Sequence, residues 1–206
     1  MSFCLIILAG GNSHRFKSNI SKPYQKIAGK SLIEINVIKA RKFKQIKKII
    51  IVYNKKHKKF LQKLSLKNTL KIVGGKTRQE SAYLALKKIE KMKCKKVLIH
   101  DVARPSTPTS LIKNVIFNLK KNHAVLPIIN ANDAAKRVKK NNVFKNIDRS
   151  TLRFSQTPQG FTFKKIYEKH KKNKSILIDD DASLFTKDNE KIKIINGSKK
   201  NIKITD

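Results

Sequence analysis

A loop near the N-terminus carries the residue types that bind phosphate. Residues 4–9 form an unbroken apolar run, which predicts a strand buried on both faces, as in parallel sheets. The run ends at Gly10 and Gly11, and glycines at a strand exit let backbone N–H groups approach a ligand closely. Arg15 and Lys22 follow and would add positive charge. On these residues alone, an ordinary strand-to-turn junction with solvated basic side chains is an equal alternative.

Sequence motifs for several other chemistries do not occur. The loop lacks the Gly-x-x-x-x-Gly-Lys-Ser/Thr of a Walker motif and a strict Gly-x-Gly-x-x-Gly, and the chain has no Gly-x-Ser-x-Gly nucleophile elbow. A phosphate-binding loop, cations and one carboxylate fit phosphoryl or nucleotidyl transfer, in which a substrate oxyanion attacks phosphorus in line. Arg15 and Lys22 would offset the charge on the equatorial oxygens.

A second glycine pair follows another predicted strand. Gly74 and Gly75 come directly after residues 70–73 and precede Thr77 and Glu80. Thr77 with Glu80 three residues later predicts a reciprocal capping box at a helix N-terminus. Such a terminus suits an anion or the edge of a base.

The sequence places one acidic residue in this otherwise basic set of loops. Asp101 follows the predicted strand 96–99, and Arg104 lies three residues further on. Asp101 suits metal coordination or a hydrogen bond to a ribose or substrate hydroxyl, and the alternative is a helix cap or a partner for Arg104. We expect His100 to be a packed histidine at the strand end rather than a general base.

Further along, Asp179–Asp181 precede Ala182 and Ser183. We expect this triplet to cap a helix N-terminus, where negative charge is favourable. A metal site is the alternative.

Strands and helices alternate along the chain at the spacing of βαβ units. This pattern predicts an α/β fold with an open, mostly parallel sheet and helices on both faces, and places the loops at the carboxyl ends of the strands. The predicted strands are 4–9, 48–53, 70–73, 96–99, 124–129, 193–195 and 202–204; the predicted helices are 32–43, 57–64, 77–89, 108–119 and 163–170.

One segment interrupts this alternation. Residues 130–155 have weak apolar periodicity and an Asn141-Asn142 turn signal between two short β-like pieces. We expect a hairpin arm that meets a second subunit, with a disordered loop as the alternative. The 206 residues otherwise suit a single domain, 1–206.

Basic residues dominate the composition. The chain has 49 Lys and Arg against 13 Asp and Glu, a net charge of +36, and only seven of the 49 are arginine. Because the lysines are dispersed and aromatic residues make up 7%, the charge favours a small polyanionic substrate over nucleic acid. A basic nucleic-acid-binding protein remains the different-class alternative.

The two cysteines and the apolar segments indicate the cellular compartment of the protein. Cys4 and Cys94 are far apart in sequence and have no metal-ligand spacing, so we expect reduced core thiols in a cytoplasmic protein rather than zinc or a disulfide framework. The N-terminus has no basic region typical of a signal peptide, and no apolar stretch approaches the roughly 20 residues that cross a bilayer.

Taken in order, the motifs resemble those of the 2-C-methyl-D-erythritol 4-phosphate cytidylyltransferase family over essentially the whole chain. They are Ala9-Gly10-Gly11 to Arg15, Lys22-Pro23-Tyr24, Gly74-Gly75 with Arg78 and Ser81, His100 to Pro105, Asp148-Arg149, Thr157-Pro158-Gln159 and Asn201 to Thr205. The resemblance implies a Rossmann-like nucleotidyltransferase fold with a twisted sheet and a protruding β-arm. It also implies transfer of CMP from CTP to methylerythritol phosphate, Mg²⁺ bound mainly with the CTP phosphates, and a homodimer joined through the arm.

The same resemblance implies roles for single residues. Arg15, Lys22 and Lys203 would be catalytic, the first two at the triphosphate and Lys203 at the α-phosphate. The implied nucleotide-binding residues are Ala9, Gly10, Gly11, Gly75, Ser81 and Asp101. The implied methylerythritol phosphate-binding residues are Asp101, Arg104, Asp133, Arg149 and Thr157.

Three positions depart from the family pattern: Pro23 replaces the usual Gln, Ala134 a frequent Thr, and Ser13 a loop glycine. The chain also ends at Asp206, where the family adds a helix, which fits a truncated copy or the first domain of a bifunctional protein fused to the cyclodiphosphate synthase. Ribitol 5-phosphate is the alternative acceptor.

Overall fold

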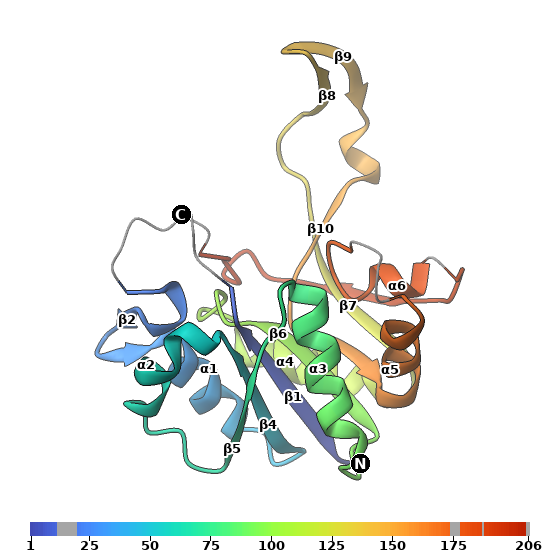
Figure 1. The fold of residues 1–206 in the computed structure, drawn as a ribbon. Helices are drawn as coiled ribbons and strands as arrows, with labels where there is room; N and C mark the ends of the chain where they lie inside the picture. The colour runs from blue at the N-terminus through green and yellow to red at the C-terminus, as the bar shows by residue number, and fades with distance from the viewer. Residues whose placement is uncertain (12–19, 174–177, 187, 205–206) are drawn as a thin grey trace.

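The fold is organised around a twisted sheet whose central strand is β1 (Phe3–Ala9). The computed structural model describes residues 1–11, 20–173, 178–186 and 188–204. All seven residues of β1 are buried, because parallel strands β4 (Ile46–Tyr53) and β6 (Lys96–Asp101) flank it and helices cover both faces (Figure 1). Parallel strand β5 (Thr69–Val73) extends the sheet beyond β4. The predicted strand at the N-terminus and its parallel neighbours are confirmed.

The other half of the sheet is mixed. Strand β11 (Gln159–Thr162) lies between β6 and β7 (Ala124–Asn130) and is antiparallel to both. Strand β10 (Arg153–Ser155) is antiparallel to β7, and β12 (Lys193–Asn196) is parallel to it. The sequence analysis missed β11, since this strand has only four residues and includes a glycine.

Alternate residues of β1 serve two hydrophobic cores. Leu5 and Ile7 face the core that α1 (Leu32–Arg41), α2 (Lys58–Gln62) and α4 (Thr109–Leu119) cover. Ile6 and Leu8 face the core under α3 (Arg78–Glu90), α5 (Phe163–Lys172) and α6 (Ser183–Thr186). The remaining short elements are η1 (Lys22–Tyr24), β2 (Lys26–Ile27), β3 (Lys30–Ser31), η2 (Lys55–His57) and η3 (Arg149–Thr151). Helices on both faces are therefore confirmed.

The N-terminus of α3 differs from the predicted capping box. Thr77 Oγ1 does accept the Glu80 N–H at 3.0 Å. The Glu80 carboxylate, however, accepts the N–H of Lys76 at 2.6 Å, one residue before the N-cap. The cap is therefore one-sided, and the Glu80 side chain lies over the glycine loop instead of closing back on Thr77.

The interrupted segment forms the predicted hairpin arm. Strands β8 (Ala135–Lys139) and β9 (Asn142–Ile147) pair antiparallel and project from the end of the sheet towards which β1 runs (Figure 1). Lys140 and Asn141 have φ angles of +47° and +64°, as a tight two-residue hairpin turn requires. The turn thus lies one residue earlier than the predicted signal.

The two cysteines form a disulfide, so the expectation of reduced thiols is wrong for this structure. Cys4 is opposite Val97 in the register of β1 and β6, and Cys94 lies two residues before the start of β6 at Lys96. The Cα atoms of Cys4 and Cys94 are consequently 6.1 Å apart despite a sequence separation of 90 residues. Parallel pairing of strands distant in sequence created a contact that cysteine spacing does not reveal.

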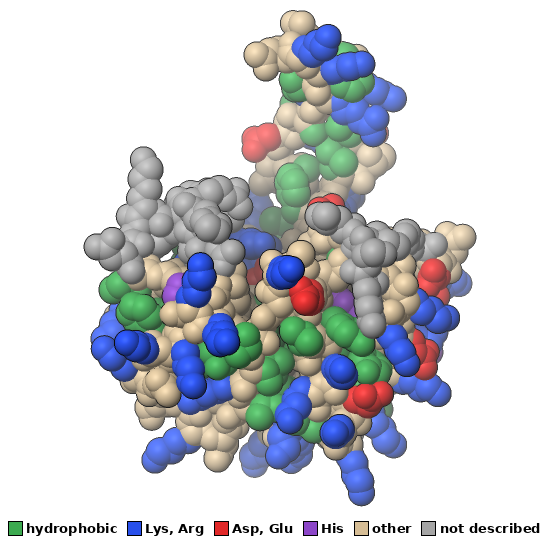
Figure 2. Space-filling model, in the orientation of Figure 1, with side chains coloured by type: hydrophobic (Ala, Val, Ile, Leu, Met, Phe, Trp, Pro, Cys, Tyr) green, Lys and Arg blue, Asp and Glu red, His purple; other side chains and the backbone are tan. Residues whose placement is uncertain are grey.

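Basic side chains are dispersed over the surface. Figure 2 shows Lys and Arg side chains distributed across the visible face rather than gathered in one patch. None of the helices in the described part of the chain is long and apolar enough to span a bilayer.

Candidate active site

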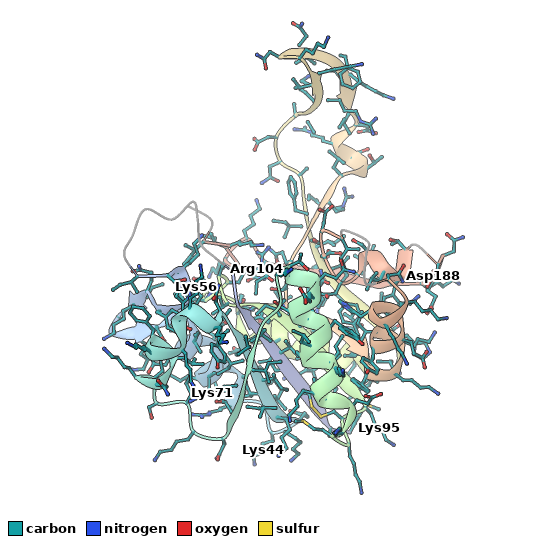
Figure 3. The ribbon with its side chains drawn as sticks, viewed as in Figure 1. Lys44, Lys56, Lys71, Lys95, Arg104 and Asp188 are labelled. Atoms are coloured by element: carbon teal, nitrogen blue, oxygen red, sulfur yellow. A yellow bond between two sulfur atoms is a disulfide. The ribbon has the colours of Figure 1, made fainter. Side chains whose placement is uncertain are left out.

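A pocket of about 910 Å³ opens at the carboxyl ends of the central strands. The loops after β1, β5 and β6 line it, together with Lys22 and Lys203. This is the edge where open α/β sheets bind ligands. In Figure 3 the labelled Arg104 lies at this end of the sheet, whereas Lys44 and Lys95 lie at the opposite end.

One wall of the pocket depends on residues without a Cβ atom. The N–H of Gly75 donates to Ser81 Oγ at 3.1 Å, and a Cβ on Gly74 would lie 2.8 Å from the same oxygen. A Cβ on Gly75 would lie 2.3 Å from Glu80 side-chain carbons, and one on Gly10 would lie 3.6 Å from Ser81 Oγ. Ser81 thereby joins the two glycine loops into a narrow surface, next to the buried Ala9.

The pocket lining also contains an ion-pair centre at Asp101. Its Oδ1 lies 3.2 Å from Arg78 Nε, and its Oδ2 lies 3.0 Å from Lys203 Nζ. Burial raises the pKa of Asp101, but Arg78 and Lys203 outweigh this and hold it well below its ordinary value. The carboxylate is therefore ionised and shared between two cations.

The donor set around Asp101 argues against a protein-bound metal. Both carboxylate oxygens already face cations, and no group of three His, Cys, Asp or Glu among the described residues could hold a metal ion. A metal at this position would be repelled by the positive charges of Arg78 and Lys203.

The segment that carries Lys203 is fixed by Arg104. The guanidinium of Arg104 donates to the carbonyl oxygens of Asn201 at 2.6 Å and Ser155 at 3.4 Å, and the N–H of Ile204 donates to the Ala103 carbonyl at 2.8 Å. Residues 201–204 form no strand, so the predicted strand 202–204 is wrong. The Arg104 guanidinium therefore bonds to backbone carbonyls rather than to the Asp101 carboxylate, although the Arg104 N–H donates to the Asp101 carbonyl at 3.1 Å.

His100 is a packed structural residue, as expected. It is only 3% exposed, and burial lowers its pKa to about 4, which keeps the ring neutral at pH 7. The side-chain amide nitrogen of Asn36 donates to two carbonyls, so Asn36 Oδ1 accepts from His100 Nε2 at 3.0 Å. His100 Nδ1 then accepts from Thr157 Oγ1 at 2.9 Å.

Thr157 is thereby oriented beside Asp101. Its hydroxyl proton goes to His100, and its Oγ1 accepts the backbone N–H of Asp101 at 3.1 Å. The structure therefore brings the predicted residues Thr157 and Asp101 together, through a buried hydrogen-bond chain that starts at Asn36.

Other predicted residues lie on the arm. Arg149 on η3 donates to the Asn132 carbonyl at 3.0 Å and lines a separate hollow of about 480 Å³ with Asn130, Ser150 and Arg153. Neither Arg149 nor the exposed Asp133 lines the main pocket. Within one chain, the predicted site is thus divided between the pocket and the arm.

The N-terminal loop is described only in part. Gly10, Gly11 and Lys22 line the pocket, whereas Arg15 and Ser13 lie outside the described residues. Pro23 follows Lys22 within the η1 turn, where the Tyr24 N–H donates to the Ser21 carbonyl at 2.9 Å. The departure at Pro23 is compatible with a regular turn.

The acidic triplet caps a helix N-terminus as predicted, but the partners of Asp181 were not foreseen. Asp180 accepts the N–H of Ser183 at 3.0 Å, as a helix cap should. Asp181 is fully buried and pairs with Arg78 at 2.8 Å and with His170 at 3.0 Å. The run of three carboxylates was the only sequence signal, and it did not reveal these partners.

The sheet order and the pocket at its carboxyl ends define an α/β nucleotidyltransferase fold. A family model described as IspD, 2-C-methyl-D-erythritol 4-phosphate cytidylyltransferase, matches residues 3–206. The chain belongs to this family.

Relatives and solved structures agree with this assignment. The chain is 48% identical over 205 residues to a bifunctional enzyme IspD/IspF of Pelagibacter ubique, covering 100% of this chain and 55% of that protein. It is 31% identical to a 2-C-methyl-D-erythritol 4-phosphate cytidylyltransferase of Bacillus mycoides, covering 98% and 92%. The crystal structure of the Francisella tularensis cytidylyltransferase superposes with a TM-score of 0.86 at 27% identity, covering 100% of this chain and 95% of that one. The chain thus spans about half the length of the bifunctional relatives.

Proposed function

We propose that this chain transfers CMP from CTP to 2-C-methyl-D-erythritol 4-phosphate, releasing pyrophosphate, in the non-mevalonate synthesis of isoprenoid precursors. The observation that carries the proposal is the pocket itself: Lys22 and Lys203 line one cavity with the narrow glycine surface of Gly10, Gly75 and Ser81. A wall of small residues suits a flat pyrimidine, and the lysines suit the phosphates. Family membership supports the same substrates.

The reaction assigns a distinct task to each side of the pocket. A phosphate oxygen of methylerythritol phosphate attacks the α-phosphorus of CTP, and the bond from that phosphorus to the bridging oxygen breaks, so pyrophosphate leaves. Arg15 and Lys22 stabilise the triphosphate, and Lys203 stabilises charge on the α-phosphate. Asp101 accepts hydrogen bonds from ribose or polyol hydroxyls. Mg²⁺, held mainly by the CTP phosphates, would neutralise part of their charge.

A pyrophosphate-release assay tests this proposal. The protein is incubated with each of four nucleoside triphosphates and with methylerythritol phosphate or ribitol 5-phosphate, in Mg²⁺ or in excess EDTA. We expect release only with CTP, methylerythritol phosphate and Mg²⁺. Turnover with ribitol 5-phosphate instead would favour the alternative acceptor, and no turnover with any pair would overturn the proposal. Salt-sensitive binding to any DNA or RNA would favour the nucleic-acid-binding alternative.

We further propose that the chain is a homodimer in which each arm completes the neighbour's site. The arm exposes Val138, Val143 and Phe144, each about 60% accessible, and carries Arg149, which its own pocket does not include. An exposed apolar hairpin of this kind is typical of an interface between subunits. Cytoplasmic location is part of the same proposal and stays a prediction.

Changing Val143 and Phe144 together to aspartate is expected to give a monomer with little activity. Analytical ultracentrifugation measures the mass, and Phe117→Asp on α4, equally exposed but away from the arm, is the matched control. Mixing inactive Arg149→Ala and Lys203→Met chains is expected to restore part of the activity, because one mixed site then has both residues. A monomeric wild-type protein with full activity would contradict the shared site.

A further inference from the structure

A continuous line of polar groups connects the interior of the protein to the pocket. His170 Nε2 on α5 donates to Asp181 Oδ1 at 3.0 Å. Asp181 Oδ2 lies 2.8 Å from Arg78 Nη1, and Arg78 Nε lies 3.2 Å from Asp101 Oδ1. Lys203 Nζ closes the line, 3.0 Å from Asp101 Oδ2. Five separate segments of the chain contribute to it.

The inner end of this line is fully buried, and its outer end, Lys203, is the most exposed member. The side chains of His170 and Asp181 are 0% exposed, those of Asp101 and Arg78 are 13% and 28% exposed, and that of Lys203 is 45% exposed. The inner end is therefore held by packing, since a buried carboxylate loses much if its partners move away. The outer end is free to exchange partners with a ligand.

Arg78 is the residue that transmits this rigidity. It is the first residue of α3, so its backbone is held by the Thr77 cap. Its planar guanidinium uses one edge nitrogen for Asp101 and another for Asp181, a fork that lysine cannot reproduce. The Asp101 carboxylate is oriented by this contact, and its second oxygen is left for Lys203 and the pocket.

Lys203 has two competing partners once substrate binds. In the structure its ammonium pairs with Asp101, but the proposed reaction requires it at the α-phosphate. The structure pairs Asp101 with two cations, Arg78 and Lys203. When Lys203 turns to the phosphate, only Arg78 of these two stays with Asp101. A loosely held carboxylate would then follow the lysine or rotate away from the substrate hydroxyl.

We propose that Arg78 is a positioning residue: anchored by the buried Asp181, it fixes Asp101 so that Lys203 can leave for the phosphate while Asp101 continues to bind a substrate hydroxyl. This inference rests on the proposed function, because the hydroxyl and the phosphate are those of its substrates. Asp181 acts through Arg78, and neither residue contacts the reacting atoms.

Kinetics of Arg78→Lys, Asp181→Asn and the double variant test the proposal. Each single change is expected to lower kcat/KM about tenfold, and the double variant is expected to lose no more, because both changes release the same carboxylate. Two independent effects would instead multiply to about a hundredfold loss. Lys165→Gln, which breaks a 2.7 Å ion pair with Glu190, is the matched control and should retain wild-type kcat/KM.

Thermal melts distinguish positioning from a purely structural role. If Arg78 only ties α3 to its surroundings, the variants will melt at lower temperature but keep wild-type kcat/KM per folded molecule, and the proposal is overturned. If Asp181→Asn does not fold, His170→Gln takes its place among the single and double variants. This change loosens Asp181 without removing its charge. Failure of the wild-type protein to turn over would count against the proposed function and is measured separately.

Discussion

Replacing Lys203 with methionine is expected to lower kcat about 10²–10³-fold, the usual cost of removing one preorganised donor to a transition-state oxyanion. The ammonium of Lys203 lies in the pocket and already faces a carboxylate, so the residue is positioned to exchange that anion for the α-phosphate. Methionine keeps most of the aliphatic stem but removes the charge. Stopped-assay rates at saturating CTP and methylerythritol phosphate measure the effect.

The fold should survive this change. The Lys203 side chain is 45% exposed, and the backbone of its segment is held by Arg104 and by the Ala103 carbonyl. Lys200→Met, in the same segment and exposed, is the control and should act as wild type. A Lys203→Met enzyme with nearly normal kcat and an unchanged melting temperature would show that the lysine has no part in the transition state.

The main layers of the fold were predictable because burial leaves a direct pattern in the sequence. The apolar run of β1 is continuous since both of its faces are covered. The helical spacing of Leu32, Ile35, Val37 and Ile38 predicted α1, although only Leu32 and Val37 of these are buried. The arm was predictable because residues 135–147 expose most of their side chains. An exposed segment has no buried face, so its sequence lacks the apolar periodicity of the other elements.

The errors lie where long-range pairing decides the structure. The four residues of β11 become a strand only because β6 and β7 flank them, and Cys4 meets Cys94 only because β6 runs beside β1. In contrast, Ile202 to Ile204 alternates like a strand but finds no neighbouring strand to pair with. Local patterns do not contain this information.

The candidate site was likewise predictable only in part. Gly10, Gly75 and Asp101 could be grouped from the sequence through the rule that strand ends meet at one edge, whereas Lys203 was placed there only by the family resemblance. The partner of Asp101 could not, because Arg104 is nearer in sequence than Arg78 yet bonds to carbonyl oxygens instead. Sequence distance does not reveal which cation a buried carboxylate selects.

Replacing Lys22 with alanine is expected to lower kcat about 10²–10³-fold as well. Lys22 lines the pocket, where the triphosphate chain would lie. The Gln25 N–H donates to its carbonyl at 3.1 Å, so η1 holds the backbone and the change removes only the side chain. By the family resemblance, Arg15→Ala is expected to have an effect of similar size.

Whether the change at Lys22 alters kcat or KM for CTP identifies the role of this lysine. If this lysine stabilises charge that develops on the triphosphate, kcat falls much more than KM for CTP rises, because the interaction is stronger in the transition state than in the bound substrate. Lys26→Ala, exposed on β2 only four residues away, carries the same charge change outside the pocket lining and should leave both constants unaltered. An equal loss in the two variants would mean that the general positive field attracts CTP, and Lys22 would then have no specific place in the reaction.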